Sequence, residues 1–178
     1  FLGEAGILLA HWRMTGSREA SDALAAAIAS NVANPANEPL WAAPGTMLAA
    51  LHMLRWTGEA RWRELYLDNV EQLWRTWQTR EQPHCHVWTQ DLYGHVVQYL
   101  GAAHGFAGNA YALLRGADLL SAERRSALYD RCAQTLEATA VVDGDCVNWP
   151  PTVGSPSGTQ KRLVQWCHGA PGIVTALA

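Results

Sequence analysis

One short pattern occurs four times in the chain, and it constrains the fold more than any other feature. Each copy has a small residue, two further residues and a glycine, followed by an apolar run with helical periodicity. The copies are Gly3-Glu4-Ala5-Gly6, Ala42-Ala43-Pro44-Gly45, Gly105-Phe106-Ala107-Gly108 and Gly169-Ala170-Pro171-Gly172. Their last glycines lie 39, 63 and 64 residues apart, a self-similarity typical of repeat architectures. Small residues let a helix begin close to a neighbouring backbone, with free N–H groups that can face a ligand.

The apolar spacing then predicts a second helix after each complete copy. The expected helix pairs are 4–14 with 17–32, 44–56 with 59–80, and 105–116 with 121–138. Thr15-Gly16 and Thr57-Gly58 end the first helix of two pairs, and Ser17 and Ser121 can cap the second helix. Residues 81–100 and 141–165 are long connections, with one short strand expected at 96–100.

Alternating short inner helices and longer outer helices predict an all-α fold, a partial α/α toroid. We expect a single domain over 1–178, with repeats at about 1–33, 38–80 and 101–139 and a truncated repeat at 166–178. In such a toroid the inner helices begin at one end of the barrel, so His104 and Cys167 should converge there. The chain begins and ends within apolar runs, as a fragment would, and the uncovered faces predict self-association.

Composition narrows the possible partners and the location. The net charge is −3 and no basic block is present, which argues against nucleic acid or an anionic membrane as the main partner. No apolar run reaches the roughly 18 residues of a membrane span. Four cysteines at irregular spacing do not resemble a secreted disulfide framework, so we expect a cytoplasmic protein. Nine tryptophans predict large aromatic surfaces around a core or cleft.

Two of the glycine-rich segments also carry reactive side chains, and both resemble motifs of the lanthionine synthetase C-like family (LanC and LanC-like proteins). Gly101-Ala102-Ala103-His104-Gly105-Phe106-Ala107-Gly108 is similar to the histidine motif of that family. Trp166-Cys167-His168-Gly169-Ala170-Pro171-Gly172 is similar to its first zinc-cysteine motif. Glu38-Pro39-Leu40-Trp41 is similar to the acidic position before an earlier repeat. The resemblance covers nearly the whole chain.

The resemblance implies a cytosolic α/α toroid with one zinc ion that lowers the pKa of a substrate thiol. The thiolate, from a peptide or from glutathione, then adds to dehydroalanine or dehydrobutyrine to give a thioether. By the same resemblance, Cys167 is a zinc ligand and His104 the acid/base group, and Glu38 takes the place of a catalytic aspartate. His168, Trp166 and Arg162 are candidates for binding the substrate.

The sequence departs from the family pattern in its metal ligands. The family site needs two further ligands, a Cys-His pair in a following repeat, and the chain ends before that repeat. Cys85-His86 lies upstream of the histidine motif, so we do not assign it to this role. A lone Cys167 thiolate cannot hold zinc tightly, because zinc sites use three or four protein ligands.

Each candidate also has a simpler interpretation. Cys167 could be a small core residue, His104 could bond a backbone carbonyl, and Glu38 could be a solvated residue after the helix-breaking segment Asn34-Pro35-Ala36-Asn37. We expect His84, Cys85 and His86 to lie in a surface connection, Cys132 and Cys146 to be structural, and the tryptophan stripe of 59–80 to lie in the core.

Two other functions therefore stay open beside thiol addition. One is a non-catalytic toroid that binds a peptide or partner protein in its central cleft. The other is a different α/α-barrel enzyme, acting on carbohydrates or isoprenoids. That second alternative would need paired carboxylates or an aspartate-rich run at the helix ends, and the sequence has neither.

Overall fold

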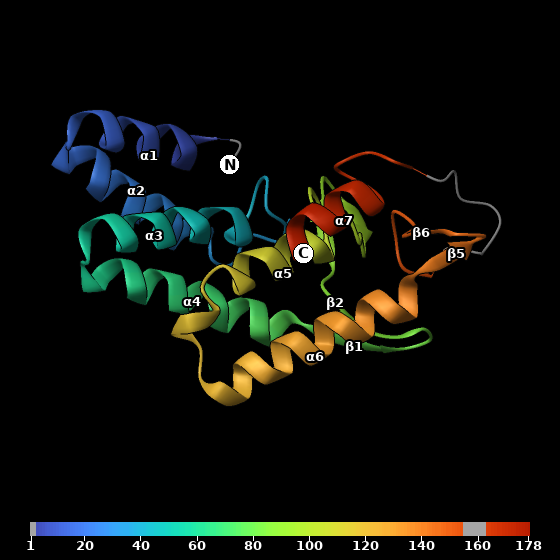
Figure 1. Ribbon diagram of the computed structural model, residues 1–178. Coiled ribbons are helices and arrows are strands. Elements are labelled where there is room, and N and C mark those ends of the chain that lie inside the picture. The colour runs from blue at the N-terminus through green and yellow to red at the C-terminus, as the bar shows by residue number, and fades with distance from the viewer. Residues whose placement is uncertain (1–2, 155–162) are drawn as a thin grey trace.

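Two sets of helices form the body of the protein. The computed structural model describes residues 3–154 and 163–178. In the first set, each helix packs against the next: α1 (Glu4–Thr15), α3 (Ala43–Thr57), α5 (Phe106–Leu114) and α7 (Ala170–Leu177). The second set is α2 (Arg18–Asn31), α4 (Ala60–Thr76) and α6 (Ala122–Thr139), which pack against the first (Figure 1). The described residues are mostly helical, as the sequence predicts.

The helix ends follow the local signals in the sequence. α1 and α3 end at Gly16 and Gly58, both in the left-handed conformation, with φ of 67° and 70°. Side-chain oxygens of Ser17 and Ser121 accept hydrogen bonds from backbone N–H groups in the first turns of α2 and α6. A glycine has no Cβ to oppose positive φ, and a serine cap satisfies an amide that the helix leaves unpaired. The sequence alone is therefore enough to predict these helix ends correctly.

The expected helix over 59–80 is too long. α4 ends at Thr76, and the next residues form an antiparallel hairpin of β1 (Gln78–Glu81) and β2 (His84–Val87). β2 packs against α6, and its side chains alternate between exposed and buried. Cys85 is therefore fully buried, so the expectation of a surface position is wrong for this residue.

The two long connections contain more strands than expected. β3 (Gln90–Leu92) pairs with β4 (His95–Val97), and β5 (Val141–Asp143) pairs with β6 (Cys146–Asn148). The strand expected at 96–100 is divided: β4 ends at Val97, whereas Tyr99 pairs with Thr152 of the second connection. The connections therefore hold each other, through the Leu100 N–H to Pro151 carbonyl bond and the Val153 N–H to Gln98 carbonyl bond.

The core lies around α3, α4 and α5. α3 and α5 are buried along most of their length, whereas α4 buries one face through Trp62, Tyr66, Val70 and Leu73. That face is the predicted tryptophan stripe, and its place in the core is confirmed. Trp88, after β2, stacks on Trp77 with ring centroids 4.2 Å apart, and its indole N–H donates to the Leu73 carbonyl. One aromatic side chain thus joins the end of α4 to the hairpin segment.

All four cysteines are free thiols. Burial raises the pKa of Cys132 to about 12 and also raises the pKa of Cys85, so both thiols stay protonated.

In the part of the chain that the structure describes, no helix is both long enough and apolar enough to cross a membrane. The short 3₁₀ helix η1 (Ala117–Leu119) joins α5 to α6.

We predict that Tyr66→Phe destabilises the protein by about 1–2 kcal/mol, the usual cost of losing a buried hydrogen bond. The Tyr66 hydroxyl donates to the carbonyls of Ala112 and Leu113, 3.0 and 3.2 Å away, at the end of α5. Urea unfolding followed by circular dichroism measures the change. Tyr129→Phe, at a half-exposed position on α6, is the control and should leave the unfolding free energy unchanged.

Candidate functional site

A buried carboxylate and an imidazole form the centre of the site. Glu38, in the segment before α3, is fully buried, and its Oε2 lies 2.9 Å from Nδ1 of His104, in the segment before α5. The same carboxylate accepts hydrogen bonds from the backbone N–H groups of Leu40 and Trp41. An ionised carboxylate only accepts hydrogen bonds, so Nδ1 of His104 is the protonated ring nitrogen. Nε2 is then free to exchange a proton.

The backbone that carries His104 is a closed loop. The N–H groups of Phe106 and Ala107, at the start of α5, donate to the carbonyls of Tyr99 and Leu100, 2.9 and 3.1 Å away. We expected such N–H groups to be free for a ligand. At these two positions that expectation is wrong, because the preceding loop folds back onto the helix start. The loop thereby fixes the His104 backbone.

Two buried amides that the sequence did not single out hold the Glu38 segment. Asn109 of α5 donates to the carbonyl of Asn37, 2.9 Å away, and Gln90 of β3 donates to the same oxygen. The side-chain oxygen of Gln90 accepts from the Tyr99 N–H, 2.9 Å away. Gln90 therefore links the backbone beside Glu38 to the loop that carries His104. No sequence signal marked either residue, because a single amide side chain does not reveal its hydrogen-bond partner.

The cysteine motif forms a tight turn beside this pair. Gln165 and His168 exchange two backbone hydrogen bonds, which place Trp166 and Cys167 at the tip. The Cys167 thiol lies 3.6 Å from the side-chain oxygen of Gln165, and the Trp166 side chain is largely exposed. Arg162, the other substrate-binding candidate, lies outside the described residues.

Glycines allow the turn to approach the His104 loop. A Cβ at Gly101 would lie 1.9 Å from the Cys167 carbonyl oxygen, so only a residue without a side chain fits there. Gly169 has φ of 96°, and a Cβ on it would meet the Leu163 carbonyl oxygen at 2.0 Å. Asn148 completes the support, because its side chain accepts from the Ala170 N–H and donates to the Leu163 carbonyl.

This approach places three rings together. The His168 ring lies 6.2 Å from the His104 ring and 5.6 Å from the Tyr99 ring, measured between centroids. Burial lowers the pKa of His168, and the nearby His104 lowers it further. Nδ1 of His168 is buried and has no hydrogen-bond partner within the described residues. The structure thus brings together Glu38, His104 and His168, with Cys167 on the adjoining turn.

The described residues do not by themselves form a zinc site. Over residues 3–154 and 163–178, no group of three or more His, Cys, Asp or Glu side chains is arranged to hold a metal ion. Cys167 bonds to an amide oxygen, a poor zinc ligand beside the thiolates, imidazoles and carboxylates that zinc prefers. A zinc ion here would need ligands other than the described residues.

With this geometry in hand, comparison with known proteins identifies the family. The family model described as lanthionine synthetase C-like protein matches residues 86–178, which include the histidine loop and the cysteine turn. The chain belongs to this family. Glu38 lies outside the matched range, so its pairing with His104 rests on the structure.

The chain is also similar to an individual protein of known name. The chain is 29% identical over 97 residues to the protein named Glutathione S-transferase LANCL1 of Danio rerio. The aligned region covers 54% of this chain and 21% of that protein. The chain therefore matches about a fifth of the length of this LanC-like relative.

We predict that Gly101→Ala moves the cysteine turn away from the His104 loop, because the new methyl group would occupy the place of the Cys167 carbonyl. Iodoacetamide should then alkylate Cys167 faster, as measured by mass spectrometry of the peptide that contains it. Gly58→Ala is the control, since its positive φ costs stability but the space around it is open. Equal alkylation rates in the wild type and Gly101→Ala would contradict the described contact.

Proposed function

We propose that this LanC-like chain takes part in adding a thiol to dehydroalanine or dehydrobutyrine, with His104 as the acid/base group. The observation that carries the proposal is the hydrogen bond between His104 Nδ1 and the buried Glu38 carboxylate. The thiol is a peptide cysteine or glutathione, and the name of the Danio rerio relative supports glutathione.

The reaction needs one proton at a defined position. The thiolate sulfur bonds to the β-carbon of the dehydroamino acid, and the displaced electron pair moves through the α-carbon to the carbonyl oxygen as an enolate. Nε2 of His104 takes the proton that the thiol releases, and the imidazolium then gives this proton to the α-carbon, which restores the carbonyl and completes the thioether. The imidazole is neutral again at the end, so the cycle balances.

Glu38 acts through His104 in this proposal. Its carboxylate accepts the Nδ1–H, so it fixes the ring orientation and leaves Nε2 toward the substrate. It also stabilises the imidazolium before the proton is given up. Because the Glu38 side chain is fully buried, a substrate cannot reach its oxygens, so Glu38 is a positioning residue.

Three further parts of the proposal rest on the family. Zinc, when bound, would favour the thiolate form of the substrate thiol, with Cys167 as one of its ligands. Trp166, His168 and Arg162 would contact the substrate. The alternating helices would continue as an α/α toroid in one domain, and the protein would act in the cytoplasm. The consecutive packing of α1, α3, α5 and α7 supports the toroid.

A binding function without catalysis is the second candidate. The observation that favours it is that the described residues supply no complete set of zinc ligands. In that case the same site would bind a peptide without changing it.

We predict that His104→Gln lowers the rate of thiol addition by about 100- to 10,000-fold, the usual contribution of general acid–base catalysis. The assay follows the addition of glutathione to a dehydroalanine peptide, by mass spectrometry, with zinc present. Glu38→Gln should lower kcat with little effect on KM, because the amide reorients the imidazole without touching the substrate. His84→Gln, at an exposed position on β2, is the control. A wild-type rate equal to the uncatalysed rate would favour the binding function.

We also predict that this chain binds zinc only weakly, with Cys167 as one ligand, and that Cys167→Ser lowers the amount bound at a given zinc concentration. Equilibrium dialysis against zinc chloride, followed by elemental analysis, measures it. Cys146→Ser is the matched control, since Cys146 is also accessible but lies on the β5–β6 hairpin. Equal zinc content in the wild type and both variants would exclude Cys167 as a ligand.

A further inference from the structure

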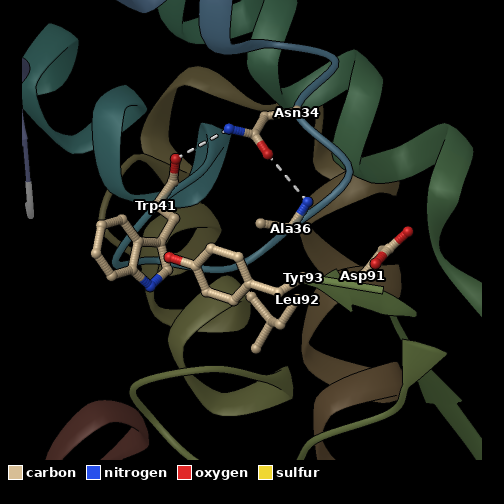
Figure 2. Close-up of a pocket in the computed structure, with 6 residues that line it drawn as sticks. All are labelled: Asn34, Ala36, Trp41, Asp91, Leu92 and Tyr93. Carbon is tan, nitrogen blue, oxygen red and sulfur yellow. Dashed lines mark hydrogen bonds between the residues drawn. The ribbon is translucent and has the colours of Figure 1, made fainter. Parts of the chain in front are cut away.

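A cleft lies beside the segment that carries Glu38. Its walls are the segment before α3 and the hairpin of β3 and β4, and its volume is about 280 Å³ (Figure 2). The lining residues are Asn34, Ala36, Trp41, Asp91, Leu92 and Tyr93. Neither the family match nor the proposed reaction accounts for it.

Hydrogen bonds hold the walls in place. The Asn34 side chain donates to the Trp41 carbonyl, 3.1 Å away, and accepts from the Ala36 N–H, 3.0 Å away (Figure 2). The Asp91 N–H donates to the Pro35 carbonyl, 2.9 Å away, and so ties the hairpin to the opposite wall. A cleft with fixed walls loses little entropy when a ligand binds.

Two aromatic rings are exposed in this cleft. The Trp41 and Tyr93 rings meet edge to face, with centroids 6.5 Å apart, and Tyr93 is 87% exposed. Tyr93 and Gly94 are the two residues between β3 and β4, with φ of 55° and 83°, and a two-residue hairpin turn favours positive φ at both positions. The turn thus fixes the Tyr93 backbone at the tip of the hairpin, beside Trp41.

The charge in the cleft selects the kind of ligand. The Asp91 carboxylate uses Oδ1 to accept from the Gly94 N–H, 2.9 Å away, which leaves Oδ2 for another donor. No Lys or Arg lines the cleft within the described residues. Aromatic faces and a carboxylate together suit an organic cation, most of all a guanidinium, which stacks on rings and bonds a carboxylate.

We propose that this cleft binds a basic side chain, arginine or lysine, of a peptide. The cleft adjoins the pair of Glu38 and His104, because the backbone N–H of Trp41 donates to Glu38 Oε1. The proposal therefore deepens the proposed function: the peptide that carries the dehydroamino acid would also carry a basic residue, which the cleft recognises.

Titration of ¹⁵N-labelled protein with N-acetyl-Gly-Arg-Gly-amide, followed by NMR, tests the proposal. The indole N–H signal of Trp41, assigned with Trp41→Phe, should shift on binding. The matched peptide with citrulline, which has the same shape without the charge, should bind at least about fivefold more weakly. No titration step needs zinc or thiol addition, so this result is independent of the catalytic proposal.

Variants of the cleft give the second measurement. Asp91→Asn keeps an acceptor for the Gly94 N–H and should weaken the arginine peptide about fivefold without affecting the citrulline peptide. Tyr93→Leu should weaken the arginine peptide similarly, whereas Tyr129→Leu and Asp145→Asn, at exposed positions outside the cleft, should not. Equal binding of the two peptides, unchanged binding to Asp91→Asn, or absence of a Trp41 shift would overturn the proposal.

Discussion

Close contact between backbones is the constraint on which the site depends. The cysteine turn reaches the His104 loop only because Gly101 leaves room for the Cys167 carbonyl, and the start of α7 fits only because Gly172 leaves room for the Trp166 carbonyl. A methyl group at either position would have to displace a peptide unit, which cannot yield as a flexible side chain can. Gly101 and Gly172 thus set the distances between backbone segments of the site.

A buried carboxylate is costly unless its charge is compensated, and Glu38 shows how this chain meets that cost. Two backbone N–H groups and one imidazole N–H surround its oxygens. The two amides come from the same tight segment, so this part of the compensation is local. Only the third donor, His104, comes from a distant part of the sequence, and it is also the group that the proposed chemistry uses. Stability and function therefore share one contact.

Much of the fold could be predicted from signals that act within a few residues. The errors lie where the structure depends on contacts between residues farther apart in the sequence. The caps at Ser17 and Ser121 and the ends at Gly16 and Gly58 act within one turn, so the sequence alone identifies them. The end of α4 at Thr76 depends instead on the stacking of Trp77 on Trp88, which no local pattern contains. The predicted helix also included residues 78–80, which carry no apolar residue and so give no periodic signal for either a helix or a strand.

The candidate site was predictable to a similar extent. The motifs indicated His104, Cys167 and Glu38 one by one, and the structure adds that Glu38 and His104 meet. Gln90 and Asn109 escaped notice because their partners are backbone carbonyl and N–H groups, which every residue has. The structure gives the positions of His104, Cys167 and Glu38, and their chemical roles stay predictions.

The pairing of Tyr99 with Thr152 has a consequence for the order of folding. α1 to α4 pack mainly against one another, and these neighbours are close in sequence, so their contacts can form early. The loop that carries His104 is held by residues 151–153, about fifty positions later in the chain. Closing a loop of that length costs conformational entropy, and the contacts that offset this cost form only after the loop has closed. In a chain that is still being synthesised, α1 to α4 can therefore pack before the loop that carries His104 is held, because Thr152 is added only later.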